Sequence, residues 1–184
     1  MTGWQTHATR TAYDNHWIRV REDDVTRPDG SAGVYGVVEM KHPAVFVVPV
    51  TAAGEVLLVR LHRYPIDRES IEVPAGGSDG EDPLAAAQRE LLEETGRTAS
   101  SWTRLGQFFA LNGVANARAD VFLARGLGQD GEPAEGPGAE AEGISEVLVV
   151  PWAEAMGLVR SGAIHDSEAI AALMLAGLEL GLIA

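Results

Sequence analysis

Three glutamates lie close together in one short segment, at spacings that suit a divalent cation. The segment is PAGGSDGEDPLAAAQRELLEETG, residues 74–96, and the glutamates are Glu90, Glu93 and Glu94. On a helix, spacings of three and four residues place side chains on one face, where like charges destabilise the helix by about 0.2–0.5 kcal/mol per pair. Mg²⁺ prefers hard oxygen ligands such as carboxylates. A bound cation would offset the repulsion, so the spacing indicates a metal site.

The local sequence predicts a helix over residues 83–95 that would carry these glutamates. Asp82 is a good N-cap, Pro83 suits the first helical position, and Gly96 ends the helix. The expected apolar stripe consists of Leu84, Ala87, Leu91 and Leu92. The alternative for this segment is a capped surface helix whose glutamates are simply solvated.

The bulk composition describes an acidic protein with an ordinary apolar core. The chain has 184 residues, of which 46% are hydrophobic and 22% are charged, and its formal net charge is −13. This length suits one domain, or one domain with a small appendage. The acidity argues against binding to a nucleic-acid backbone. Because the chain has no cysteine, disulfides and thiolate catalysis are excluded.

No segment has the pattern of a targeting signal or a membrane span. The first 20 residues include charged residues such as Asp14 and have no apolar centre, and no window approaches 18 uninterrupted apolar residues. We therefore expect a cytoplasmic protein that acts on a small molecule and binds neither nucleic acid nor membrane.

Short apolar runs between turn residues predict an α+β protein with a mixed sheet. The runs at residues 44–50 and 55–64 are almost continuously apolar, so we expect central strands there. Other strands are expected at residues 17–22, 32–40, 71–73, 102–111, 119–127 and 144–152. Other helices are expected at residues 153–162 and 166–181, the second capped by Asp166 or Ser167. Residues 128–143, rich in Gly, Pro and acid, are expected to form a mobile loop.

Residues 81–96 closely resemble the Nudix box. That family pattern is Gly, five residues, Glu, seven residues, Arg-Glu, an apolar residue, any residue, Glu-Glu, any residue, Gly and an apolar residue. Here Glu81 is followed after seven residues by RELLEETG, residues 89–96, so every charged position is in register. Two positions depart from the pattern. Gly76 lies five residues before Glu81 instead of six, so the loop is one residue short, and Arg97 replaces the final apolar residue.

The resemblance extends to the branch of this family that hydrolyses ADP-ribose and other nucleoside diphosphate sugars. It is carried by HWIRVREDDVTRPDGSAGVYGVVE, VVPVTAAGEVLLVRLHRYP, RESIEVPAGG and VPWAEAMGLVRSGAIHD. It implies the Nudix fold, an α/β/α sandwich around a mixed sheet with an N-terminal β-strand extension. Residues 43–184 would be the hydrolase domain, and residues 1–42 would be the N-terminal strands, which the resemblance assigns to contacts within a homodimer.

The resemblance also implies roles for the box residues. The implied metal ligands are the Ala75 carbonyl oxygen, Glu90, Glu94 and Glu93. They would hold Mg²⁺ or Mn²⁺, which neutralises diphosphate charge and lowers the pKa of a bound water. Arg89 would hold an acid in place, with Glu93 within reach. Glu81 would be a supporting acid, or a favourable charge near the start of the helix.

A general base is implied to come from the acidic loop, from Glu142 or Glu140, with Glu93 as the third acid of the catalytic set. The alternative is that the two loop residues are solubilising acids in a disordered segment. The implied substrate-binding residues are Arg63, Glu72, Gly76, Asn112 and Gly113. Arg63 would face a phosphate or form a surface salt bridge. Glu72 would contact a nucleobase or ribose, or would only order the loop.

These residues together predict Mg²⁺-dependent hydrolysis of ADP-ribose or a related nucleoside diphosphate sugar. The products would be a nucleoside monophosphate and a sugar phosphate. Alternative substrates are NADH, a dinucleoside polyphosphate and GDP-mannose, since the proline that ADP-ribose enzymes often carry near Asn112 is absent. A non-catalytic nucleotide sensor is a further alternative, although such modules usually lose box acids, and a Nudix-fold isomerase would use a cysteine.

Overall fold

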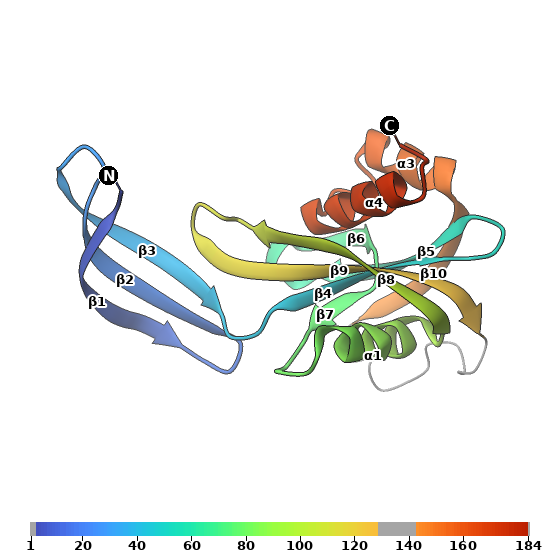
Figure 1. Ribbon diagram of the computed structural model, residues 1–184, viewed down its shortest axis with the longest axis horizontal. Coiled ribbons are helices and arrows are strands. Elements are labelled where there is room, and N and C mark those ends of the chain that lie inside the picture. The colour runs from blue at the N-terminus through green and yellow to red at the C-terminus, as the bar shows by residue number, and fades with distance from the viewer. Residues whose placement is uncertain (1–2, 129–142, 184) are drawn as a thin grey trace.

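The computed structural model describes residues 3–128 and 143–183, and these form a layered body with a projecting β-ribbon (Figure 1). A mixed sheet is the middle layer. Helix α1 (Pro83–Thr95) covers one face, while α3 (Trp152–Ser161) and α4 (Ser167–Glu179) cover the other. The predicted α+β class and α/β/α sandwich are therefore confirmed. Among the described residues, no helix is both long and apolar enough to cross a lipid bilayer.

The body of the sheet is built around two buried neighbouring strands, β4 (Ala44–Val50) and β5 (Glu55–Arg63). Strand β4 runs parallel to β9 and antiparallel to β5, which in turn is antiparallel to β10. The other strands of the body are β6 (Arg68–Glu72), β7 (Ala75–Gly77), β8 (Thr98–Ala110), β9 (Ala115–Gly128) and β10 (Ile144–Pro151). Strand β7 adds to β4, β6 to β5 and β8 to β9.

Strand β4 contributes to an apolar core on each face of the sheet, which explains its continuous apolar sequence. Val45 and Val47 are buried against α1 together with Leu91. Phe46 and Val48 belong to the second core, which contains the buried residues of α4. The expectation that residues 44–50 and 55–64 form central strands is thus confirmed.

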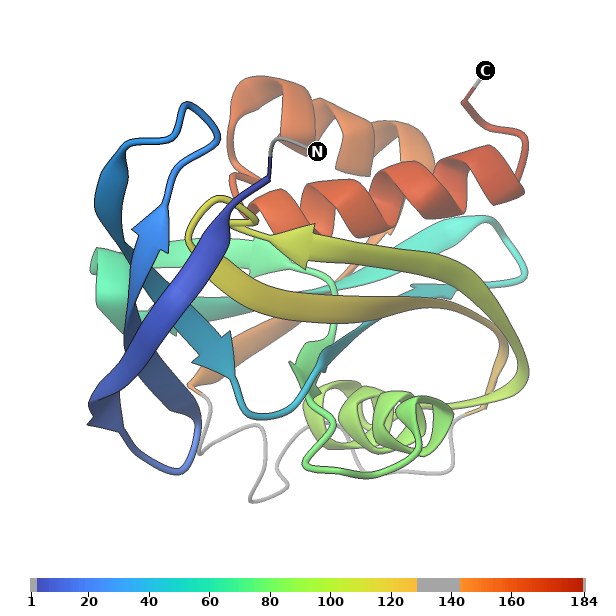
Figure 2. The same cartoon turned by 60° about the vertical axis from the view of Figure 1, so that its left-hand side comes forward.

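The N-terminal strands form a three-stranded antiparallel ribbon that we call the arm: β1 (Gln5–Asp14), β2 (Ile18–Thr26) and β3 (Ala32–Met40). It projects from the body in Figure 1, and in Figure 2 it is turned toward the viewer at the left of the molecule. Its link to the body is a short parallel pairing of β3 with β9, Val38 opposite Ala115. Every residue of β1 is exposed, so this strand is held by backbone pairing and side-chain hydrogen bonds with β2 and not by a core.

Helix α1 has the predicted bounds and caps, but its buried face differs from the predicted stripe. The Asp82 carboxylate accepts hydrogen bonds from two backbone N–H groups of the first turn, and Gly96 ends the helix in the left-handed conformation. Leu84 and Leu92 are exposed, by 36% and 43%, so these two predicted core positions are wrong. The buried face consists of Ala86, Ala87, Glu90, Leu91, Glu94 and Thr95. The helix is rotated so that two acids point inward.

Other elements largely follow the sequence pattern. Asp166, and not Ser167, is the N-cap of α4, and Gly162 follows the last residue of α3. Strand β1 and the short strand β7 were not predicted, because β1 is almost entirely polar and β7 is Ala-Gly-Gly. The expected loop at residues 128–143 lies mostly outside the described residues.

Candidate active site

Glu90 and Glu94 are buried carboxylates on α1 that face β7, the short strand in the loop before this helix. Their exposed fractions are 2% and 3%. The backbone N–H of Ala75 donates to Oε2 of Glu94 at 3.1 Å, which ties the last turn of α1 to β7. Buried carboxylates cost folding energy unless they are paired or coordinated. Glu94 is paired with this N–H group and Glu90 with Arg89, so both carboxylates are held in place beside the loop.

Gly76 makes the close approach of β7 to α1 possible. A Cβ atom at this position would fall inside the Glu90 carboxylate, closer than real Cβ contacts ever come. The next residue, Gly77, is not crowded in this way, since its Cβ would meet only Oδ1 of Asp79 at 3.3 Å. The predicted substrate-binding role of Gly76 is not tested by this geometry, which assigns it a steric role beside Glu90.

Arg89 joins the box acids and the loop into one network. Its guanidinium contacts Oε1 of Glu90 at 2.8 Å, Oε2 of Glu93 at 3.0 Å and Oε2 of Glu81 at 3.2 Å. It also donates to the Gly77 carbonyl at 2.9 Å. Burial alone would lower the pKa of Arg89, but the hydrogen bond to Glu81, the charge of Glu90 and the hydrogen bonds to Glu93 and Glu90 raise it. Arg89 is thus a permanent cation that orients three acids.

The residues present suit a hard divalent cation. Glu90 and Glu94 offer carboxylate oxygens from one helix face. The absence of a side chain at Gly76 leaves room for the Glu90 carboxylate beside the loop. Oxygen ligands of this kind favour Mg²⁺ or Mn²⁺ over softer metals. Within residues 3–128 and 143–183, no three acids or histidines already surround one common cation position. Glu93 is half-exposed and paired with Arg89, so it lies at the edge of this acid group.

Arg63 and Glu72 form a two-pronged ion pair at the end of the β5–β6 hairpin. The Arg63 Nε donates to Oε1 of Glu72 at 2.9 Å, and Nη2 donates to Oε2 at 2.5 Å. Glu72 is buried, whereas the Arg63 side chain is 44% exposed. The hydrogen bond to Glu72 raises the pKa of Arg63, and the charges of Asp166 and Glu94 act in the same direction. The structure thus joins two predicted substrate-binding residues to each other and places them near Glu94.

Replacing Arg63 with alanine should destabilise the protein by about 2 kcal/mol. The substitution leaves the buried Glu72 charge uncompensated, which costs about 3–5 kcal/mol in fully buried pairs and less here because Arg63 is partly exposed. Urea unfolding would measure the change, with Arg68→Ala on the exposed hairpin as the control. The double variant Arg63→Ala/Glu72→Gln should recover part of the loss. A double variant less stable than Arg63→Ala alone would contradict this assignment.

Asp166 and Glu168, at the start of α4, also lie close to the Arg63–Glu72 pair. The Asp166 carboxylate caps α4 by accepting from the Ala169 N–H at 2.6 Å, and it shares a hydrogen bond with Glu168. Burial raises the pKa of Asp166 to about 7, with further contributions from Glu168 and Glu72. The sequence identified Asp166 only as a cap, because its proximity to Glu72 depends on how α4 packs across the sheet.

Substituting Asp166 with asparagine should make the protein more stable than the wild type above neutral pH. Because the folded state binds the Asp166 proton more tightly than the unfolded state, wild-type stability falls as the pH rises from about 4 to about 7. Asparagine keeps the helix cap and removes this titration. Thermal unfolding of both proteins between pH 5 and pH 8 would measure it. A constant difference in Tm across this range would show that the raised pKa is wrong.

The predicted residues Asn112 and Gly113 lie at the exposed turn between β8 and β9. The Tyr35 hydroxyl, on the arm, donates to the Gly113 carbonyl at 2.5 Å. This turn is therefore joined to the arm, and its predicted contact with substrate stays a prediction. Glu140 and Glu142, the predicted bases, lie outside the described residues.

The chain belongs to the NUDIX family. The NUDIX domain model matches residues 40–173, and the model of the nucleoside diphosphate sugar hydrolase N-terminal domain matches residues 4–38. The resemblance seen in the box residues is thus confirmed, and the protein is a Nudix pyrophosphohydrolase.

Similar proteins of known name support this family assignment. The chain is 35% identical over 166 residues to the ADP-ribose pyrophosphatase of Bacillus subtilis, covering 89% of this chain and 87% of that protein. It is 33% identical over 176 residues to the ADP-ribose pyrophosphatase of Mycobacterium tuberculosis, covering 93% and 82%. The crystal structure of an ADP compounds hydrolase superposes with a TM-score of 0.83 at 22% identity, covering 97% of this chain and 95% of that one. That likeness shows the shared fold.

Proposed function

We propose that this enzyme hydrolyses the diphosphate bond of ADP-ribose or a closely related nucleoside diphosphate sugar. The observation that carries the proposal is the pair of buried acids, Glu90 and Glu94, held against the Ala75–Gly77 strand. Carboxylate oxygens of this kind are the ligands that Mg²⁺ prefers. Relatives named ADP-ribose pyrophosphatase match most of the chain, which supports this substrate class.

The reaction adds one water across the diphosphate. The water oxygen bonds to one phosphorus, the bond from that phosphorus to the bridging oxygen breaks, and the other phosphate leaves with the electron pair. The products are a nucleoside monophosphate and a sugar phosphate. The proton of the attacking water passes to a general base, for which Glu142 or Glu140 remain the predicted residues.

Mg²⁺, or Mn²⁺ in its place, is the proposed cofactor. Glu90, Glu94 and the Ala75 carbonyl would hold it, with Glu93 nearby. When bound, such an ion supplies Lewis-acid stabilisation of the diphosphate and a water of lowered pKa. Arg89 orients Glu90 and Glu93 through the contacts described above, and Glu81 restrains Arg89 from the other side.

We further propose that the arm, residues 1–42, makes a homodimer in the cytoplasm. Several large apolar side chains are exposed on it, including Tyr13, Trp17 and Val34 at 54–68%. Exposed apolar surface of this kind is typical of an interface. Light scattering after gel filtration should give twice the mass of the 19.5 kDa chain. A monomer at micromolar concentration would contradict the proposal.

A substrate panel tests the proposed function. It would contain ADP-ribose, ADP-glucose, GDP-mannose, NADH, a dinucleoside polyphosphate and ATP, with Mg²⁺ present and products separated by chromatography. We expect the highest kcat/KM for ADP-ribose or another nucleoside diphosphate sugar. Preferential cleavage of NADH or the dinucleoside polyphosphate would show that the protein is a Nudix hydrolase with a different preferred substrate. Nucleotide binding without any cleavage would favour the sensor alternative.

A further inference from the structure

Asp120, on β9, is a fully buried carboxylate shared by two arginines. Its exposed fraction is 0%. Oδ1 accepts a hydrogen bond from Nε of Arg104 at 3.0 Å and a second one from Nη2, and Nη2 of Arg118 lies 3.5 Å from Oδ2. A buried charge persists where it is paired in this way. Within residues 3–128 and 143–183 neither arginine forms another salt bridge, so one positive charge of this group is left uncompensated.

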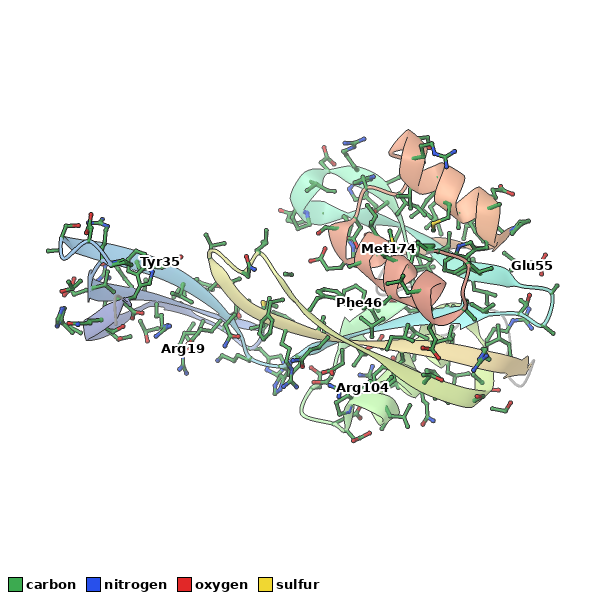
Figure 3. All side chains as sticks on the ribbon, turned by 45° about the horizontal axis from the view of Figure 1, so that its top comes forward. Arg19, Tyr35, Phe46, Glu55, Arg104 and Met174 are labelled. Atoms are coloured by element: carbon green, nitrogen blue, oxygen red, sulfur yellow. The ribbon has the colours of Figure 1, made fainter. Side chains whose placement is uncertain are left out.

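Arg104 lines an open groove beside the first turn of α1. The groove has a volume of about 560 Å³, and its walls are Asp82, Pro83, Leu84, Trp102, Arg104 and Phe122. Figure 3 shows Arg104 beside α1. The Arg104 side chain is 56% exposed, although its partner Asp120 is fully buried. Asp120 therefore restrains the guanidinium through Nε and Nη2, while Nη1, which donates to no other described residue, remains available to a ligand.

Trp102 lies two residues before Arg104 on β8 and forms an aromatic wall of the groove. Its indole Nε1 donates to the Ala99 carbonyl at 3.1 Å. Its ring meets the buried Phe122 ring edge to face, with centroids 6.5 Å apart and planes at 75°. These contacts set the orientation of the indole before any ligand binds. A fixed ring and a restrained guanidinium lose little side-chain entropy on binding.

The charge and the spacing of these two side chains favour a nucleoside monophosphate. The chain has a formal net charge of −13, so an uncompensated positive charge in a groove selects for an anion. A guanidinium binds phosphate through paired N–H donors, and an indole ring stacks on a nucleobase. Residues i and i+2 of a strand share one face and lie about 7 Å apart, and the ribose of a nucleotide separates phosphate and base by a similar length. An anionic group attached directly to an aromatic ring would be too short to contact both side chains.

We propose that this groove is a second nucleotide site, in which Arg104 binds the phosphate of a nucleoside monophosphate and Trp102 stacks on its base. Asp82 supplies an acceptor at the helix side of the groove. Both of its cap hydrogen bonds to α1 use Oδ1, so Oδ2 can accept from a base amino group or a ribose hydroxyl. The site uses none of the residues assigned to the diphosphate, so the inference is independent of the proposed function.

Calorimetry without divalent metal tests the two halves of the site, with AMP, adenosine and ribose 5-phosphate as probes. Adenosine lacks the charged group, and ribose 5-phosphate lacks the base. A hydrogen bond to a charged group and a stacked base are each worth about tenfold in affinity or more. We therefore expect AMP to bind at least that much more tightly than either fragment. Equal affinities for AMP and one of its fragments, or no AMP binding at millimolar concentration, would overturn the proposal.

Leu84 allows the groove to be blocked without a change at the Asp120 ion pairs. It lines the groove, is 36% exposed and lies in the first turn of α1, where a carboxylate is compatible with the helix. Leu84→Glu places a negative charge in the groove and should weaken AMP binding by about tenfold or more. The neutral Leu84→Gln should stay within about threefold of the wild type. Equal affinities of the two variants for AMP would overturn the proposal.

Three further variants show where AMP binds. Arg104→Gln should lose about tenfold in AMP affinity, whereas Arg125→Gln, at an exposed position on β9, should retain it. Glu94→Gln should bind AMP like the wild type, because this glutamate belongs to the box. AMP affinity that is lost in Glu94→Gln but retained in Leu84→Glu would place AMP at the box acids and overturn the proposal. A protein that shows the expected AMP binding but cleaves no sugar nucleotide would contradict the proposed function and support this second site.

Discussion

Replacing Glu94 with glutamine should lower kcat for the preferred sugar nucleotide by more than about a hundred-fold. Removing a residue that hydrogen-bonds to a metal ligand commonly lowers metal affinity or activity by about 10–100-fold. Glu94 is proposed as a direct ligand, so its effect should be larger. The fold should survive, because the glutamine oxygen can still accept the hydrogen bond from the Ala75 N–H. Steady-state kinetics at saturating Mg²⁺, together with the Tm of both proteins, would measure the two effects separately.

Glu179→Gln is the matched control for this substitution. It makes the same chemical change at an exposed position near the end of α4, so it should alter neither kcat nor Tm. Near-normal activity of Glu94→Gln would remove this residue from the metal site. A large fall in Tm would instead show that Glu94 acts mainly in stability.

Substituting Gly76 with alanine should lower kcat by about a hundred-fold with little loss of stability. The added methyl group would occupy the position of the Glu90 carboxylate. The end of a glutamate side chain can move aside at low cost, so the fold can accommodate the change. The carboxylate, however, would leave its place at the loop, and a misplacement of about 1 Å in an active site can cost roughly a hundred-fold in rate.

Gly77→Ala provides a close control, because it adds the same methyl group one residue later. That methyl would meet only Asp79, at 3.3 Å, and we expect kcat within about threefold of the wild type, since a contact of this kind displaces no proposed ligand. If both variants were equally active, the close approach of Gly76 to the Glu90 carboxylate would have no role in the reaction. If both were equally inactive, the effect would come from loop flexibility and not from Glu90.

The box helix was the most predictable part of the molecule because its signals are local. Asp82, Pro83 and Gly96 determine where α1 begins and ends within a few residues of sequence. The rotation of the helix was less predictable. The pattern predicts that Leu84 and Leu92 are buried, but the buried face of α1 contains Glu90 and Glu94 instead. A stripe assigned from hydrophobicity alone fails where function requires buried acids.

The remainder of the candidate site depends on contacts between distant segments. Arg63 and Glu72 were each predicted to touch substrate, yet their ion pair follows from the way the β5–β6 hairpin closes. Asp166 reaches this pair only because α4 crosses the sheet.

The most direct test of the account is hydrolysis of ADP-ribose by protein stripped with a chelator, as Mg²⁺ is added back. We predict no product before the addition and a rate that rises with Mg²⁺ to saturation, with AMP and ribose 5-phosphate released in equal amounts. The Glu94→Gln variant should remain inactive at every Mg²⁺ concentration. Equal rates with and without chelator, or full activity of Glu94→Gln, would contradict the claim that the buried glutamates hold a metal against the diphosphate.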